Sequence, residues 1–348
     1  MPAGIGDPFL YLENDGRRAA TVSVLDAAKV SKHGIEILDP SSLGGDELVA
    51  AGLDRLGIDA EIALRAAAEL GITAALVPPE FPLFVADHLR ANGISLTVDD
   101  GEFSSRRRVK SAPEIEGIRR AQKAADAAMG VARSLIHELR DGLTSEEVRA
   151  AMQAVADEHG CELPDDVIVS HGAQSAIGHD SGSGAIGAGE PVVVDIWPRD
   201  KRSRCWSDMT RTFVAGGGEP PEELATYWRL TRDSLDRVYA DLGPGVNGRA
   251  LFERSCEPYI EAGQPTQLTK EPGKPLEDGY FHGLGHGIGL EVHERPFMGR
   301  IGDELIAGDV VTVEPGCYRR GFGGCRLEDL VVVTEDGYEL LTNFPYEL

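Results

Sequence analysis

The sequence has 348 residues, of which 42% are apolar, so it is long enough for about two globular domains with full hydrophobic cores. Its 34 Lys and Arg stand against 58 Asp and Glu, and the formal net charge of -24 disfavours nucleic acid and anionic lipid as partners. The sequence has neither a secretory signal pattern at its N-terminus nor a run of about 20 apolar residues, so we expect a cytoplasmic protein without membrane contact.

The cysteines form an odd set without a CxxC pair, which disfavours both a disulfide framework and a thiolate zinc site. They are Cys161, Cys205, Cys256, Cys317 and Cys325. We expect all five to be free thiols.

Residues 21–98 alternate between β-prone runs and helical stretches. The runs TVSVL, ITAALV and ISLTV begin at Thr21, Ile72 and Ile94, and the helical stretch DAEIALRAAAEL covers residues 59–70. This alternation is typical of an α/β layer. Because the basic stretch RRRVK then interrupts the pattern, we expect an N-terminal α/β domain at 1–110 and a second domain at 111–348.

Two helices are expected at the start of the second domain. The first begins at Ser111, where Pro and Glu occupy the first turn, and we expect it to continue to Gly142. Thr144 and Glu147 have the spacing of a capping box, which predicts a second helix that ends at Gly160. Neither helix carries residues that suggest chemistry.

From residue 165 onward, short β-prone runs alternate with Gly- and Pro-rich turns and one helical stretch, which predicts an α+β catalytic domain. Three runs carry an acid where a core strand is normally apolar: Asp195 in VVVDIW, Glu314 in VVTVEPG and Glu328 in RLEDLVVV. A carboxylate in such a place needs a compensating partner. Asp208 in WSDMTRTFV lies at the start of a further run.

The segment FHGLGHGIGLEVHERP adds three histidines to these acids, His282, His286 and His293. Four carboxylates carry about four negative charges, which two divalent ions neutralise, so the acids predict two metal ions about 3.5 to 4 Å apart. Oxygen-rich ligation with one imidazole suits manganese, cobalt or zinc more than copper. A single Asp at a strand end is more often a turn or cap residue, so the prediction depends on several acids lying inside apolar runs.

Over about residues 110–348 the sequence resembles the metallopeptidase family of methionine aminopeptidase, prolidase and aminopeptidase P, whose catalytic domain has the pita-bread fold. The segments HGLGHGIGLEVHERP, VVTVEPGCY and GCRLEDLVVVTEDG match the family in residue type and order. The resemblance implies an α+β pita-bread domain after a smaller α/β domain, and a homodimer. It further implies that Asp195 binds one of two divalent ions, with manganese the first choice. His286 and Glu314 then bind the other ion, while Asp208 and Glu328 bridge both.

The resemblance also implies residues that act on a substrate. His179 in QSAIGHD and His293 match substrate-binding positions, from which they would stabilise the charge that develops on the scissile carbonyl oxygen. His282 resembles a histidine that lines the pocket of Xaa-Pro enzymes. Arg326 matches an arginine of that subgroup, and we expect it either to hold a substrate carboxylate or to form a plain salt bridge. Glu314 is expected to shuttle the proton, so the expected catalytic set is His179, His293, Glu314 and Arg326.

An N-terminal domain favours enzymes that cleave before proline over minimal methionine aminopeptidases. The compact length favours a prolidase-like Xaa-Pro dipeptidase, while an aminopeptidase P that acts on longer proline-containing peptides stays open. A non-catalytic peptide-binding relative or a metal-free creatinase-like enzyme is expected to lack part of the ligand set. The sequence departs from the family after Asp195, where Ile196 and Trp197 replace the usual Gly-containing pattern and the next loop is longer. We expect Trp197 to shape the pocket mouth.

Overall fold

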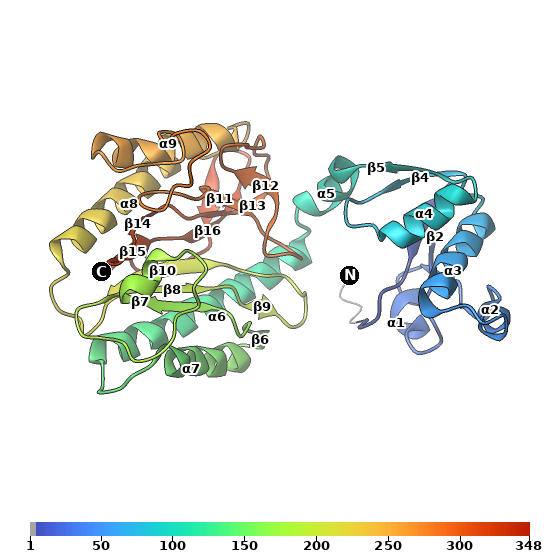
Figure 1. The fold of residues 1–348 in the computed structure, drawn as a ribbon, viewed down its shortest axis with the longest axis horizontal. Helices are drawn as coiled ribbons and strands as arrows, with labels where there is room; N and C mark the ends of the chain where they lie inside the picture. The colour runs from blue at the N-terminus through green and yellow to red at the C-terminus, as the bar shows by residue number, and fades with distance from the viewer. Residues whose placement is uncertain (1–4) are drawn as a thin grey trace. The chain divides into compact units, whose positions relative to one another are not determined.

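The structure is a computed structural model that describes residues 5–348. The chain divides into two compact units, Met1–Ser105 and Arg106–Leu348 (Figure 1). Within the described residues, every helix is too short or too polar to cross a membrane.

The first unit mixes short strands and helices, in agreement with the α/β prediction. Its strands are β1 (Tyr11–Asn14), β2 (Arg17–Ala20), β3 (Glu36–Ile37), β4 (Ala74–Val77) and β5 (Ser95–Val98). Its helices are α1 (Ala27–Ser31), α2 (Gly45–Ala50), α3 (Arg55–Glu69) and α4 (Leu83–Ala91), and α5 (Asp100–Arg108) leads into the second unit. β4 and β5 pair in parallel and fall in two of the predicted β-runs, and α3 covers most of the predicted helical stretch.

The predicted strand at Thr21–Leu25 is wrong. The chain there forms a turn, and the strands lie earlier, where β1 and β2 pair as an antiparallel hairpin. Asp15 and Gly16 form its two-residue turn with φ angles of 47° and 78°, the left-handed conformation that such hairpins require. Val24 and Leu25 are 81% and 85% exposed, and Val22 alone of the three apolar residues is buried, so the run contributes little to the core.

Two long helices open the second unit, α6 (Ala112–Glu138) and α7 (Ser145–Glu158). The predicted starts are confirmed, since Ser111 and Thr144 are the N-cap residues and each forms a capping box with the Glu three residues later. The predicted end of the first helix at Gly142 is wrong by several residues. Leu139 adopts a left-handed conformation with φ 34° and packs its side chain against the core, which ends α6 at Glu138.

The rest of the second unit is built around two antiparallel sheets, with strand orders β10-β8-β7 and β12-β11-β13-β16-β17. The three-stranded sheet contains β7 (Ile168–His171), β8 (Pro191–Ile196) and β10 (Met209–Val214), and short β6 (Cys161–Glu162) pairs with β9 (Arg199–Asp200). The larger sheet contains β11 (Gly285–Gly287), β12 (Glu294–Met298), β13 (Val310–Val313), β16 (Asp329–Val333) and β17 (Tyr338–Leu340). The hairpin of β14 (Gly316–Arg319) and β15 (Gly323–Arg326) joins β13 to β16. A 3-10 helix covers Gly172–Ala176.

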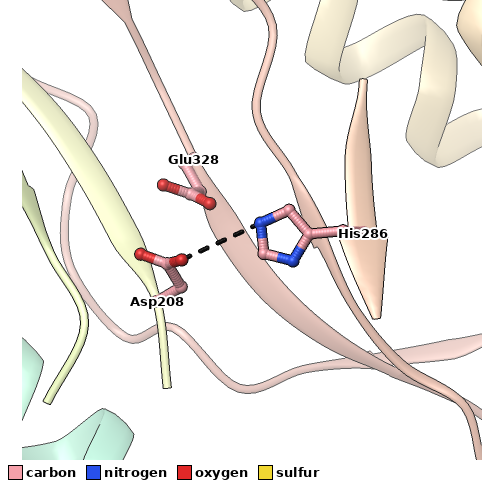
Figure 2. Close-up of side chains that lie close together, drawn as sticks. All are labelled: Asp208, His286 and Glu328. Carbon is pink, nitrogen blue, oxygen red and sulfur yellow. Dashed lines mark ion pairs between the residues drawn. The ribbon is translucent and has the colours of Figure 1, made fainter. Parts of the chain in front are cut away.

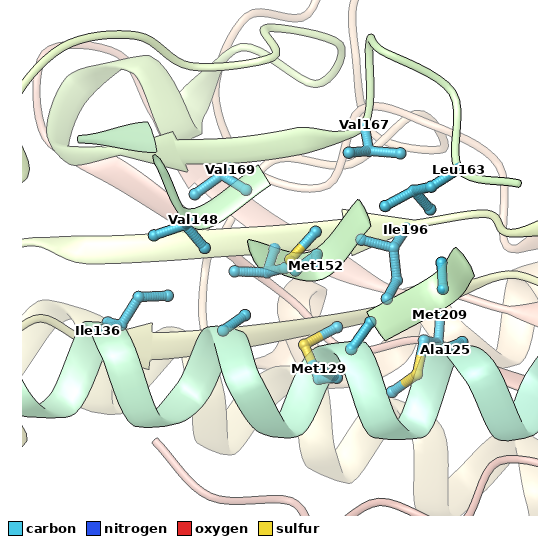
Figure 3. Packing of buried hydrophobic residues seen from close by; sticks show 14 of the residues in the cluster. Ala125, Met129, Ile136, Val148, Met152, Leu163, Val167, Val169, Ile196 and Met209 are labelled. Carbon is cyan, nitrogen blue, oxygen red and sulfur yellow. The ribbon is translucent and has the colours of Figure 1, made fainter. Parts of the chain in front are cut away.

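Helix pairs cover both sides of these strands. In Figure 1, α6 and α7 lie on one side, and α8 (Glu222–Asp241) and α9 (Gly248–Glu261) lie on the other. Figure 3 shows one core, in which Met129 of α6 and Met152 of α7 pack with Ile196 and Met209 of the three-stranded sheet. A second core joins α8 and α9 to the larger sheet. Each large apolar side chain fully buried in this way contributes about 1.5 to 3 kcal/mol, so the strands between the helix layers are held rigidly.

The five cysteines are free and buried, which confirms the expected thiols. Burial raises the pKa of Cys161 to about 11 and that of Cys325 to about 12, so both are uncharged at neutral pH.

Candidate metal centre

The four acids of the predicted site lie where strands begin or end. Asp195 is near the end of β8, directly opposite Thr210 of β10, and Asp208 immediately precedes β10. In the larger sheet Val313 pairs with Asp329, so Glu314 after β13 and Glu328 before β16 are the next residues beyond that pair. The two sheets therefore each bring two carboxylates to one place.

His286 reaches the acids from the middle of β11. Its neighbours must be glycine because a Cβ at Gly285 would lie 2.1 Å from the Thr312 oxygen, and one at Gly287 2.3 Å from the Arg295 oxygen. The backbones of the neighbouring strands therefore approach β11 closely on both sides of His286. The Nδ1 atom of His286 lies 3.1 Å from the carbonyl oxygen of Gly287. A proton on Nδ1 donates to that oxygen and leaves the Nε2 lone pair free for a metal.

Among the described residues, Asp208, His286 and Glu328 form the one group of His, Cys, Asp and Glu with a ligand atom from each within 4.8 Å of the others (Figure 2). The Nε2 atom of His286 lies 3.9 Å from Asp208 Oδ2 and 3.5 Å from Glu314 Oε1. Asp195 Oδ1 and Asp208 Oδ1 are buried without a hydrogen-bond partner. Buried carboxylate oxygens of this kind need a cation, and the oxygen-rich set with one free imidazole nitrogen fits divalent metal ions.

The electrostatics of the metal-free site follow from burial. Burial, followed by the charge of Glu328, raises the pKa of Asp208 well above its ordinary value, and burial followed by the charge of Glu314 does the same for Glu328. Burial raises the pKa of Glu314 to about 7. Burial, with the nearby His293, lowers the pKa of His286 to about 3, so its imidazole is neutral. The site therefore holds protons at neutral pH that positive ions would replace.

The guanidinium of Arg326 already has protein partners and does not have the free nitrogens that binding a substrate carboxylate would need. It is only 4% exposed, and its Nη2 donates to Asp195 Oδ2 at 2.6 Å. Its Nη1 donates to the Tyr318 hydroxyl at 3.0 Å and its Nε to Thr210 Oγ1 at 3.2 Å. This geometry favours the salt-bridge alternative, in which Arg326 holds Asp195 in place.

Two residues that support the site, Tyr318 and Thr210, are not among those predicted from the sequence. Tyr318 links Arg326 to His282, whose Nε2 lies 3.0 Å from the Tyr318 hydroxyl. Thr210 Oγ1 donates to Glu328 Oε2 at 2.7 Å. Tyr318 stands in the motif VVTVEPGCY and Thr210 follows Asp208 by two residues, so nearness to the acids was the available signal.

The three other predicted histidines lie around the same centre. The ring centroid of His293 is 4.2 Å from that of His286, and burial, with nearby His179, lowers the pKa of His293. His179 is exposed. Burial, together with Arg326 and His179, lowers the pKa of His282 to about 3, and both ring nitrogens of His282 already have partners in Gly283 and Tyr318. Of these three histidines, His179 and His293 have exposed side chains and His282 is half-buried.

The departure after Asp195 involves two tryptophans with different surroundings. Trp197 packs against the core between α6, α7 and the three-stranded sheet. Trp206, at the far end of the longer loop, packs instead with Leu290 and donates its indole N–H to the Leu290 oxygen at 3.1 Å. The tryptophan that contacts the histidine-bearing segment is therefore Trp206.

Comparison with known proteins agrees with the fold. Residues 116–335 match the model of metallopeptidase family M24. Curated relatives include an Xaa-Pro dipeptidase of Pyrococcus furiosus, 32% identical over 72% of this chain and 67% of the relative, and one of Pyrococcus horikoshii, 31% identical over 72% and 66%. The chain thus spans about two thirds of the length of these relatives.

Solved structures resemble nearly the whole chain. An Xaa-Pro dipeptidase from Bacillus anthracis is 28% identical, with a TM-score of 0.81 and coverage of 99% of this chain and 89% of that one. An X-Pro aminopeptidase from Thermotoga maritima is 25% identical, with a TM-score of 0.80 and coverage of 99% and 88%. The predicted pita-bread architecture after a smaller N-terminal unit is confirmed. The chain belongs to metallopeptidase family M24, in the branch that resembles Xaa-Pro dipeptidases.

Proposed function

We propose that this chain is a peptidase with two divalent ions that hydrolyses Xaa-Pro dipeptides. The observation that carries the proposal is the buried convergence of Asp208, His286 and Glu328, with unpartnered carboxylate oxygens on Asp195 and Asp208. The names of the Pyrococcus and Bacillus relatives support the substrate class. A non-catalytic relative would have no need to keep this complete set of donors.

We assign the five metal ligands to the two ions from their matching positions in the family motifs. Asp195 would bind one ion, His286 and Glu314 the other, and Asp208 and Glu328 both. With the four carboxylates ionised and Arg326 beside them, the site carries a net charge of about -3, which two divalent ions offset where one would not. Manganese is our first choice of metal, with cobalt or zinc also suited to the donors.

When bound, the ions supply an activated water and polarise the scissile carbonyl. Glu314 would take the proton from that water and pass it to the leaving nitrogen, because its Oε1 lies 3.5 Å from His286 Nε2, beside the proposed ions. His293, beside His286, and exposed His179 would donate to the carbonyl oxygen as its negative charge develops. Arg326 would keep Asp195 oriented throughout.

Proline specificity has a physical basis that a short series of peptides tests. Proline's tertiary amide has no N–H, so a site built for it lacks an acceptor there, and an Xaa-Ala peptide would bury an unpaired donor at a cost of about 1 to 3 kcal/mol. With manganese, Met-Pro should therefore be cleaved at least about tenfold faster than Met-Ala. Equal rates on the two dipeptides would rule out proline specificity.

The second candidate is an aminopeptidase P, favoured by the likeness to the X-Pro aminopeptidase of Thermotoga maritima and by the burial of Arg326. Met-Pro-Gly and Met-Ala-Gly, assayed beside the dipeptides, distinguish the two candidates. A preference for Met-Pro-Gly over Met-Pro would move the assignment to aminopeptidase P. A preference for Met-Pro would support the dipeptidase.

A further inference from the structure

The segment that carries His293 has no regular structure, yet His293 lies against His286. Residues 289–293 connect the end of β11 to the start of β12 and form bends. His293 itself is exposed, and its ring contacts the ring of His286, so packing of its own ring fixes it only in part. Its position beside His286 must depend on what holds the backbone of residues 289–293, which we call the His293 loop.

Trp206 holds the first half of the His293 loop by three contacts. Its backbone N–H donates to the Gly289 oxygen at 2.9 Å, and its indole N–H donates to the Leu290 oxygen at 3.1 Å. The side chains of Trp206 and Leu290 also pack on one small apolar cluster that includes Ile288. One residue thus fixes two successive carbonyl groups and a side chain of the loop.

The tryptophan ring is itself fixed from the other side. The guanidinium of Arg199 lies 4.6 Å from the ring centroid, and Arg199 forms an ion pair with Glu162. Both Arg199 and Trp206 belong to the connection between Asp195 and Asp208. The long connection that departs from the family pattern therefore forms a rigid support for the indole.

The second half of the His293 loop is held by a buried ion pair. Lys110 Nζ lies 2.6 Å from Glu294 Oε1, with side-chain exposures of 2% and 5%, and it also donates to the Arg107 and Arg108 oxygens. A Cβ at Gly289 would lie 2.6 Å from Lys110 Cε. This pair fixes the residue after His293, and Glu294 Oε2 also accepts the Glu291 backbone N–H at 3.3 Å, so Trp206 holds the opposite end of the loop.

We propose that Trp206 is a positioning residue for His293: its indole N–H keeps the His293 loop in the conformation that presents the imidazole to the scissile carbonyl. The inference rests on the proposed function, which assigns His293 to that carbonyl. Donors act well in catalysis when they are already oriented before the charge develops, and a displacement of about 1 Å can cost a large factor in rate. Trp206 touches no substrate in this account and acts only through His293.

The test replaces the indole with a ring that lacks the N–H, in Trp206→Phe. The backbone bond to Gly289 remains, so we expect a fall in kcat for Met-Pro of about three- to tenfold, the range that corresponds to one net hydrogen bond. KM and metal content should stay within a factor of two of wild type, roughly the limit of a small effect. In the metal-free protein, amide hydrogen exchange in residues 289–293 should become faster.

The matched control is Trp228→Phe. The indole nitrogen of Trp228 is buried but has no hydrogen-bond partner, and its ring packs on the separate core around α8 and α9. This change removes the same atoms without breaking a bond, so kcat and exchange in residues 289–293 should match wild type. If Trp206→Phe does not fold, benzothienylalanine at position 206 replaces only the N–H by sulfur and keeps the ring shape.

A double-mutant cycle decides whether Trp206 acts through His293. His293→Ala should lower kcat about a hundredfold to a thousandfold with its metals retained, and Trp206→Phe should cause no further loss in that background. The inference fails if Trp206→Phe retains full kcat, if it lowers kcat by the same factor with and without His293, or if it loses metal. Full activity of His293→Ala would overturn the role of His293 and this inference with it, while leaving the metal assignment to be judged by metal content.

Discussion

At the scale of single residues, the site combines acids that repel one another with neighbours that hold them. Thr210 donates to Glu328, and Thr312 accepts the backbone N–H of His286 at 3.1 Å. Arg326 donates to Asp195 and forms an ion pair with it. Such neighbours fix ligand orientation and are expected to matter nearly as much as the ligands themselves.

Removing Arg326 should destabilise the metal-free protein. Arg326→Met leaves the charge of Asp195 buried and uncompensated, which should lower the free energy of unfolding by about 3 to 5 kcal/mol. Because metal ions supply positive charge at the same place, the loss should shrink with manganese. Arg119→Met is the control, since its pair with Glu339 is exposed and worth at most about 1 kcal/mol. Equal losses in the two variants, by chemical denaturation, would contradict the special role of Arg326.

Metal binding should tighten as pH rises. Burial raises the pKa of Glu314 from 4.5 to about 7 and also raises those of Asp208 and Glu328, so metal must displace protons from them, whereas His286, with a pKa of about 3, is already neutral. Between pH 6 and 8 the Kd for manganese should fall by about tenfold per unit for each proton released. The raised carboxyl pKa of Glu314 stabilises the metal-free fold below 4.5 and this contribution is lost as pH rises through about 7.

Calorimetric titration at pH 6, 7 and 8 measures this dependence. Glu314→Gln removes one titrating carboxyl and should give a shallower dependence than wild type. A Kd that does not change with pH would show that the acids are already ionised in the metal-free site.

At the scale of elements, β11 is closely enclosed by the backbone of its neighbouring strands. It lies between β12 and β13, and the glycines on either side of His286 have backbone oxygens of those strands close by. This packing brings the imidazole to the two glutamates of the larger sheet. The close approach of the three strands therefore both packs the sheet and positions the His286 imidazole.

A methyl group at Gly285 should separate these strands. Gly285→Ala places a Cβ 2.1 Å from the Thr312 oxygen, so the backbone must shift, at a cost of at least about 1 to 3 kcal/mol. Because His286 moves with β11, manganese affinity should fall as well. Gly337→Ala is the control, since nothing lies within 4 Å of its Cβ position. Thermal melts and metal titrations of both variants test this, and unchanged metal affinity in Gly285→Ala would show that β11 does not set the position of His286.

Local signals in the sequence were enough for some elements and insufficient for others. The N-caps Ser111 and Thr144 could be predicted because a capping box involves only four residues. The Asp15–Gly16 turn is a local signal for the β1–β2 hairpin, whereas the apolar run at Thr21 indicates a strand that does not form. The end of α6 depends on how Leu139 packs against distant core residues, which its neighbours in sequence do not specify.

The same distinction applies to the site. Acids inside apolar runs are visible in the sequence, and the structure brings Asp208, His286 and Glu328 together. The pairing of Arg326 with Asp195 joins residues 131 positions apart, and the bond from Trp206 to Leu290 spans 84 positions. Both depend on how β15 meets β8 and how one loop meets another, so residue type alone could not predict them.

At the scale of the whole molecule, the catalytic unit has two sheets, each covered by a helix pair, and each sheet supplies part of the site (Figure 1). Asp195 and Asp208 come from the sheet of α6 and α7, and His286, Glu314 and Glu328 from the sheet of α8 and α9. Ions bound by both sets would link the two halves. Ligands that bind only the folded state stabilise it, by about 2.7 kcal/mol at a hundred times Kd.

The most direct test of the two-ion site is to measure how many metal ions each chain binds and how activity depends on that number. Metal-free protein titrated with manganese should bind two ions per chain, and cleavage of Met-Pro should appear only as they bind. Asp208→Ala, which removes a carboxylate that we propose bridges the ions, should abolish cleavage and weaken binding. Full cleavage by the metal-free protein, or by protein that holds one ion and never takes a second, would contradict the two-ion site.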